Sequence, residues 1–449
     1  MRHFGATRDM TEGSIVKQLL LFSLPLMVGN VFQMLYNTVD SIVVGQYVSK
    51  EALAAVNSTT MIVNILVFFF NGFSVGAGVV IARHFGAKDY GRLHRAIETT
   101  MAMTLLFCVL FTAIGVIGVR PMLRFMSTPD DVMEDAAAYL TIYFLGISGL
   151  LIYNMGSGIL RAVGDTTRPL LFLIFTSLMN IALDLFFVLK LNAKIEGVAW
   201  ATIIAQFISA ALTLLLLTRT KEIYRLSWKD LRVEGKVLRQ IFQVGLPAGI
   251  QSVITAFSNV FVQSYINYFG SGCMAGWGCY NKLDQFIMLP MSSVAMAATT
   301  FVSQNVGAGR EDRADKGTVA AMGMSLGVTA VIAAALYLLT EQAVRLFSQD
   351  QSVIDYGVLF LRANTAFLLF NCVNHVLAGA LRGRGDSRGP MAIMLLTFVA
   401  LRQSYLFIVT RFIANTPFLV GFGYPVGWMS CCALEVSYYL IKRRKRQGA

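Results

Sequence analysis

LRAVGDTTRP, residues 160–169, returns 221 residues later as LRGRGDSRGP, residues 381–390. Other short matches share nearly the same separation. Gly86-Ala87 corresponds to Gly307-Ala308, and Leu24-Pro25 corresponds to Leu246-Pro247. Matching motifs that are spread so widely along the chain, at nearly the same separation, indicate that the chain is a tandem duplication.

The composition predicts a protein that crosses a membrane many times. The chain has 449 residues, of which 56% are apolar and only 14% are charged, and it contains 32 Phe and 21 Met. A soluble protein of this size could not bury so much apolar surface. The same composition excludes a disordered chain, and the net charge of +12 is better explained by membrane topology than by nucleic-acid binding.

Twelve apolar runs are long enough to span a bilayer, which takes roughly 20 residues. They lie near residues 15–46, 51–82, 95–119, 135–160, 167–190, 195–218, 240–268, 275–305, 317–344, 353–381, 389–412 and 416–441. We therefore predict an all-α polytopic membrane protein. Its domains are an amino-terminal six-helix bundle (1–218), a cytoplasmic linker (219–239) and a carboxy-terminal six-helix bundle (240–449). Because six is even, both bundles have the same orientation and are related by a pseudo-two-fold axis along the membrane normal.

Loop charges predict the orientation of the chain. The termini and every second loop hold most of the Lys and Arg residues, including the linker and the tail from Lys442 to Arg446. The loops on the other side hold few. By the positive-inside rule, both termini lie in the cytoplasm.

Two acids stand out among the polar residues inside the spans of the first half. Asp184 lies four residues after Asn180, and Thr202 lies four residues before Gln206, so each pair shares one helix face. Asp40 ends a polar stripe on the first span. Carboxylate, amide and hydroxyl oxygens suit a hard cation. Two close carboxylates in a low dielectric also favour retention of a proton by one of them.

The stripe before Asp40 consists of Asn30, Gln33 and Asn37, at spacings that keep all four side chains on one face. Such a face does not lie against lipid. Hydrogen bonding between helices is the structural alternative to a functional role. Pro25 lies fifteen residues before Asp40 and permits a kink, so we interpret it as a hinge, with a static kink as the alternative.

The second half lacks the acid pair, because Val262 and Tyr405 stand at the positions that correspond to Asp40 and Asp184. Coupling-ion binding is therefore expected in the amino-terminal bundle. The second half has its own polar residues, which can form a structural ion-pair network, a polar wall of a substrate cleft or a second proton site. They include Gln251, Asn259, Lys282, Asp284 and Arg402. Glu435, near the end of the last span, is interpreted as interfacial.

No catalytic or cofactor motif accompanies these residues. The six Cys and four His show no metal-ligand spacing, and no phosphate loop, Ser/His pair or channel filter sequence appears. We therefore expect no enzyme, no catalytic residue and no cofactor.

The sequence resembles the multidrug and toxic compound extrusion (MATE) transporters. The resemblance is carried by Thr11-Glu12-Gly13 leading into Leu24-Pro25, by Tyr36-Asn37-Thr38-Val39-Asp40, by the paired Arg-x-x-Gly-Asp loops, and by Asn180, Asp184 and Thr202. It implies export of organic, often cationic, compounds in exchange for Na+ or H+ by alternating access. We also expect a monomer in the cell's inner (plasma) membrane, although the sequence leaves the oligomeric state open.

The resemblance further implies particular site residues. The cation site would use Asp40, Asn180, Asp184 and Thr202, sometimes with the carbonyl of Ala199. Asn37, Tyr139 and Asn154 would lie nearby, and Pro25 would be the hinge. Candidates for the substrate cleft are Gln33, Gln206, Gln251, Asn259 and Asp284. The sequence does not separate Na+ from H+ coupling. A lipid-linked precursor flippase of the same superfamily remains the alternative function.

Overall fold

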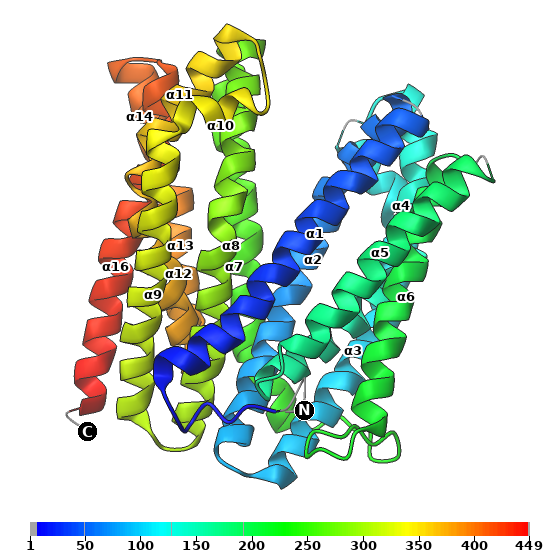
Figure 1. Cartoon of the computed structure of the whole chain (residues 1–449), viewed down its shortest axis with the longest axis vertical. Coiled ribbons are helices and arrows are strands. Elements are labelled where there is room, and N and C mark those ends of the chain that lie inside the picture. Colours follow the sequence, from blue (N-terminus) through cyan, green and yellow to red (C-terminus); the bar gives the residue numbers. More distant parts are fainter. Residues whose placement is uncertain (1–6, 49, 127, 192, 448–449) are drawn as a thin grey trace. The chain divides into compact units, whose positions relative to one another are not determined.

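A computed structural model describes residues 7–48, 50–126, 128–191 and 193–447. The described chain is helical (Figure 1). Within it, eleven helices are long and apolar enough to cross a membrane, and a twelfth span is formed when α11 and α12, which are bent by 54°, are counted as one. The predicted all-α polytopic fold is confirmed.

The first six helices correspond to the first half of the repeat. They are α1 (Ile15–Tyr47), α2 (Lys50–Gly86), α3 (Tyr90–Phe125), α4 (Asp130–Ala162), α5 (Thr167–Leu189) and α6 (Ile195–Arg219).

The second half begins with α7 (Gly235–Asn267), α8 (Ser271–Gly307) and α9 (Glu311–Leu338). A short α10 (Thr340–Arg345) leads into the bent pair α11 (Gln351–Thr365) and α12 (Leu368–Gly383). The next span combines α-helical and π-helical turns: α13 (Arg388–Met394), η1 (Leu395–Leu401), α14 (Arg402–Ile408) and η2 (Val409–Ile413). The last span consists of α15 (Pro417–Gly421) and α16 (Gly423–Gln447).

The chain folds into two compact units whose borders lie inside α1 and α7. Unit 1 comprises residues 1–9 and 24–245, and unit 2 comprises residues 10–23 and 246–449. The predicted domain borders at 218 and 239 were placed in the connecting loop. The structure instead divides the chain directly before Leu24-Pro25 and Leu246-Pro247, so residues 219–239 pack with unit 1.

Glycines hold α4 close to α6 in unit 1. A Cβ atom added to Gly146 would lie 2.4 Å from the Ile203 side chain, and one added to Gly149 would lie 2.9 Å from the backbone nitrogen of Phe207. Small residues at a helix interface allow backbones to approach, which is how helices pack in a membrane. This close packing brings the face of α4 with its tyrosines against the face of α6 that carries Thr202.

Glycines also allow α12 to approach α8 closely in unit 2. Thr299 Oγ1 donates to the carbonyl of Gly379 at 3.0 Å, and Ser303 Oγ donates to the carbonyl of Gly383 at 3.0 Å. A Cβ atom at either glycine would lie 2.6 Å from a backbone carbonyl oxygen of α8. The carboxy-terminal end of α12 is therefore held firmly.

The segment before α1 is tied to unit 2 by side chains of α8 and α9. The backbone nitrogen of Met10 donates to Gln304 Oε1 at 2.8 Å, and Asn305 Nδ2 donates to the Met10 carbonyl at 3.2 Å. Arg313 Nη2 donates to the carbonyls of Glu12 and Gly13. These bonds explain why residues 10–23, which include the first turns of α1, belong to the second unit although they come first in the chain.

Candidate functional site

The two acids predicted for the coupling site meet in unit 1. The carboxyl groups of Asp40 on α1 and Asp184 on α5 lie within hydrogen-bonding reach of each other. Asp184 is fully buried, and one oxygen of each carboxyl group is buried without a hydrogen-bond partner. No arginine or lysine acts on either group in the part of the chain that the structure describes.

Asn180 and Thr202 complete the centre of the site. With its amide oxygen towards α6, Asn180 donates to Asp184 Oδ2 at 3.1 Å and accepts from the backbone nitrogen of Thr202 at 3.2 Å. Thr202 Oγ1 donates to the carbonyl of Val198 at 3.1 Å, one turn earlier on α6. The one-turn spacing of Asn180 and Asp184 thus places both side chains at the same point of the unit, as the sequence predicts.

Three tyrosines line the same region. The Tyr36 hydroxyl, one turn before Asp40 on α1, lies near the Thr202 side chain and in the electrostatic field of both acids. Tyr139 on α4 lies in the electrostatic field of both acids, and its ring stacks with that of Tyr143 at a centroid distance of 6.5 Å. Tyr139 was expected from the resemblance. Tyr36 and Tyr143 were missed, although the four-residue spacing of Tyr36 and Asp40 would have indicated a shared face.

Gln206 extends this polar region along α6. Its side chain lies near the Tyr143 hydroxyl, and its Oε1 atom is buried without a hydrogen-bond partner. Ala199 is fully buried three residues before Thr202 on the same helix. Both residues were predicted as site candidates, and both lie in the layer formed by α4 and α6.

Other candidates of the first half lie elsewhere. Gln33 and Asn37 are exposed side chains of α1. Asn154 donates to the carbonyl of Leu150 at 3.0 Å on its own helix, and eleven residues separate it from Tyr143, which is about three helical turns. The structure therefore does not bring Asn154 to the two acids.

Two candidates of the second half, Asn259 and Asp284, lie around the cluster of Arg402, Tyr280 and Tyr424, whereas Gln251 has other contacts. Gln251 is buried, and its Nε2 atom contacts Met394 Sδ at 2.7 Å. Asn259 Oδ1 accepts from Arg402 Nη2 at 3.1 Å. Asp284 acts on Tyr280 of its own helix and has a buried oxygen without a partner.

The ion pair considered between Lys282 and Asp284 is absent from the salt bridges of the described residues. Lys282 is exposed, and its ammonium group lies 5.5 Å from the centre of the Phe347 ring. Residues two apart on a helix point to different sides, which explains the separation.

Arg402 is 1% exposed and lies over the rings of Phe398 and Tyr424, each with its centre 5.1 Å from the guanidinium carbon. Glu435 corrects our interpretation of the last span: it was expected at the interface, but it is completely buried within unit 2. The position of Glu435 around the helix axis turns its side chain towards the inside of unit 2. Its closeness to the end of the predicted span does not reveal this orientation.

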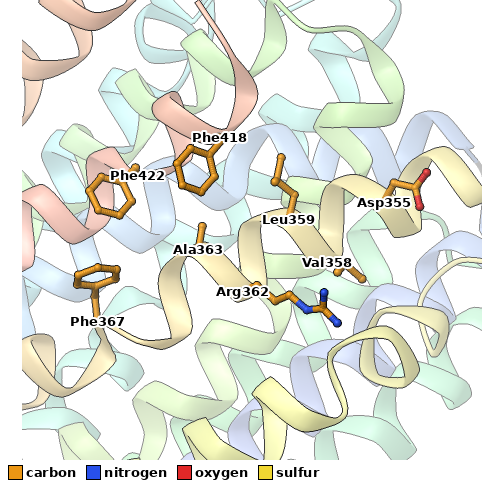
Figure 2. A pocket seen from close by; sticks show the side chains of 8 residues that line it. All are labelled: Asp355, Val358, Leu359, Arg362, Ala363, Phe367, Phe418 and Phe422. Atoms are coloured by element: carbon orange, nitrogen blue, oxygen red, sulfur yellow. The ribbon is translucent and has the colours of Figure 1, made fainter.

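A pocket of about 480 Å³ lies elsewhere in unit 2, at the bend between α11 and α12. Figure 2 shows Phe367, Phe418 and Phe422 gathered at one end and Asp355 at the other. None of the predicted site residues lines this pocket.

Comparison with known proteins identifies the family. The MatE family model matches residues 25–186 and 247–407, which are the two repeats and begin at Pro25 and Pro247. The chain belongs to the MATE family. This membership confirms the resemblance stated from the sequence motifs, and it makes the chain a multi-pass membrane transporter by family.

Several curated relatives align along nearly the whole chain. The probable multidrug resistance protein YpnP of Bacillus subtilis is 28% identical over 437 residues, covering 97% of each chain. The multidrug export protein MepA of Staphylococcus aureus is 24% identical, covering 96% of this chain and 95% of MepA.

Solved structures share the fold. An outward-facing multidrug resistance MATE family transporter aligns with a TM-score of 0.92 at 20% identity, covering 99% of this chain and 100% of the other. A transporter from Pyrococcus furiosus, whose binding pocket is described as having reversed polarity, aligns with a TM-score of 0.90 at 21% identity, covering 97% of each chain.

Proposed function

We propose that the protein is a secondary active exporter of organic compounds, often cationic ones, and that a cation bound between Asp40 and Asp184 drives export by alternating access. The cation is either a proton or Na+. We place the protein in the plasma membrane as a monomer with both termini in the cytoplasm, in line with its loop charges. The similarity to MepA and YpnP, which are named for multidrug export and resistance, supports the class of substrate.

The proposal depends on one observation, the contact between the fully buried carboxyl group of Asp184 and the partly buried one of Asp40, which no basic side chain neutralises. Two ionised carboxylates in contact repel each other strongly in a medium of low dielectric. The pair is therefore stable when it shares a proton or holds a cation. The unpartnered oxygens of Asp40 and Asp184 provide hard ligands for either ion.

The residues around the pair suit a reversible site. Asn180 on α5 donates to Asp184 and accepts from the backbone of α6. The Asn180 side chain therefore joins α5 to α6. Asp40 comes from α1, whose border between the units lies sixteen residues earlier. An ion that joins Asp40 to Asp184 stabilises the state in which α1 packs against α5. A ligand shifts an equilibrium only by its differential affinity for the two states, and this contact provides such a difference.

A flippase for lipid-linked precursors would need a basic wall that faces the substrate. Arg402 and Lys282 are basic residues within the predicted spans of the second half. Arg402 is buried between two aromatic rings, and the Lys282 ammonium group lies over Phe347. These contacts favour the exporter.

The test is efflux of a cationic dye from proteoliposomes under separately imposed pH and sodium gradients. We expect one gradient to drive efflux by the wild-type protein, and we expect Asp40→Asn and Asp184→Asn each to reduce that efflux to the level of empty liposomes. Glu134→Gln is the matched control, because Glu134 is an exposed acid of the same unit that pairs with Arg120. Full gradient-driven efflux by both variants would refute the assignment.

A further inference from the structure

Glu435 is the most completely buried acid of unit 2. It lies on α16 with none of its surface exposed, and both of its carboxylate oxygens lack a hydrogen-bond partner. An ionised carboxylate in such surroundings is very unfavourable unless it has a partner, so the group either is neutral or acquires one. Ionisable groups inside membrane spans are functional candidates by default.

One basic group acts on this acid. Arg382, near the end of α12, is the charged side chain whose field reaches Glu435. The two do not form a salt bridge among the ion pairs of the described residues. Arg382 Nη1 instead donates to Gln251 Oε1 on α7 at 3.5 Å, which is a long hydrogen bond, and Arg382 Nε has no partner. Both members of the pair are therefore incompletely satisfied.

The other titratable groups near Glu435 carry no charge that could replace Arg382. Cys431 and Cys432 face Glu435 from its own helix. His375 lies on α12 two turns before Arg382, in the field of that arginine. Since the backbone of α12 is fixed to α8 through Gly379 and Gly383, a change in pairing has to be made by the Arg382 side chain itself.

The first repeat supplies an internal comparison. Arg161 is the residue that corresponds to Arg382 in the duplicated loop, and its Nη2 atom donates to Ser74 Oγ at 3.3 Å. The group that acts on Arg161 is the Tyr153 phenol rather than a carboxyl group. The partly buried arginine is thus common to both repeats, whereas the acid whose field reaches it belongs to unit 2.

We propose that Glu435 is a proton-binding site of unit 2, with Arg382 as its counter-ion and Gln251 as the alternative partner of that arginine. When Glu435 carries a proton, Arg382 remains on Gln251 and connects α12 to α7. When the proton leaves, the carboxylate draws Arg382 towards α16, and Gln251 keeps only its contact with Met394. Proton occupancy thereby selects which helix α12 is joined to. This site does not depend on the function proposed for unit 1.

The experiment is an infrared pH titration of the full-length protein in lipid nanodiscs, in a background carrying Asp40→Asn, Asp184→Asn and Asp284→Asn, so that these three acids, each with a buried oxygen that lacks a partner, do not contribute. We expect a protonated-carboxyl band that disappears as the pH rises and that is lost in Glu435→Gln. Glu341→Gln, which removes an exposed acid paired with Arg345, is expected to leave the band unchanged.

Two further variants guard against misfolding of Glu435→Gln. Glu435→Asp retains a carboxyl group and is expected to keep a titrating band with a shifted midpoint. Arg382→Gln removes the counter-ion and is expected to retain the band to higher pH. Amide hydrogen exchange around Gln251 is expected to follow the same pH midpoint in the protein with Glu435 intact. The proposal would be overturned if the titration spectra of Glu435→Gln coincided with those of the protein that retains Glu435. It would also be overturned if Arg382→Gln did not shift the pH midpoint of the band.

Discussion

Gly76→Ala tests the close contact between α2 and the first part of α7, both of which belong to unit 1. A Cβ atom at Gly76 on α2 would lie 2.6 Å from the Cα and nitrogen of Gly245 and from the carbonyl oxygen of Ile241. All three are backbone atoms, so no change of rotamer relieves the clash. Since carbon atoms pack at about 3.5–4.0 Å, the two helices would have to separate by about 1 Å. Overpacking of this kind typically costs about 1–3 kcal/mol.

Gly78→Ala is the matched control, two residues away on the same helix. A Cβ atom there would lie 3.7 Å from the carbonyl oxygen of Gly158, which is an ordinary contact. Both substitutions gain the same helix propensity, roughly 0.5–1 kcal/mol, because alanine loses less backbone entropy than glycine. The difference between the two variants therefore isolates the clash with α7.

The measurement is the thermal unfolding midpoint of each purified variant in detergent, at one heating rate because membrane proteins often unfold irreversibly. For a unit of this size, about 2–4 °C are lost for each kcal/mol. We expect Gly76→Ala to unfold several degrees below Gly78→Ala, and dye efflux to fall with it. Equal midpoints for the two variants would show that α2 and α7 do not meet at their backbones, and the reasoning would fail.

Three other substitutions have definite expected results. Pro25→Ala restores the backbone N–H that proline lacks and removes the predicted hinge, so initial dye-efflux rates should fall without a lower unfolding midpoint; unchanged efflux would contradict the hinge. Although burial raises the pKa of Asp386, hydrogen bonds such as that from the Tyr438 hydroxyl at 2.7 Å outweigh it and lower the pKa. Asp386→Asn should therefore lower the free energy of unfolding by roughly 1–2 kcal/mol at neutral pH. A carboxyl group with a lowered pKa stabilises the fold only while it is ionised, so the difference from wild type should vanish as the pH falls below about 4. A difference that does not depend on pH would refute this cause. Arg384→Gln removes a guanidinium that forms a partly buried bridge to Asp315, but Asp315 keeps its bridges to Arg443 and Arg446. The substitution should therefore cost about 1–3 kcal/mol by thermal unfolding, and no measurable loss would mean that solvent screens the pair.

Hydrophobicity and the internal repeat were sufficient to predict the fold. Each predicted span overlaps a helix or bent pair of the structure, because a chain in lipid satisfies its backbone hydrogen bonds within helices. The 54° bend between α11 and α12 was not predictable in this way. No proline or glycine lies near Phe367, where the helix breaks, so the usual sequence signals for a kink are missing.

The site was predictable where its residues repeat along one helix face. Asn180 and Asp184 share a face of α5, and the structure places both in contact with the site. Asn154 was expected there from the resemblance, but eleven residues along α4 separate it from Tyr143, which does reach Gln206. Tyrosines are easily grouped with apolar residues in a hydrophobicity pattern, so their hydroxyl groups were overlooked.

The placement of the two unit borders connects the acid sites with the fold. Both borders lie at the same position of the repeat, directly before Leu24-Pro25 in α1 and Leu246-Pro247 in α7. Each of these helices therefore begins in one unit and continues in the other, and in each the border lies next to a proline, which removes a backbone hydrogen bond and permits a bend.

The polar groups proposed to respond to ions lie on the far side of those borders. Asp40 follows Pro25 on the part of α1 that belongs to unit 1, and Gln251 follows Pro247 on the part of α7 that belongs to unit 2. Binding at Asp40, as proposed, would tie α1 to α5, and Arg382 connects α7 to α12 through Gln251. Each proposed ion would thus act on a helix whose other end belongs to the opposite unit. If that is correct, stiffening either helix at its proline should weaken export even with every ion-binding residue intact.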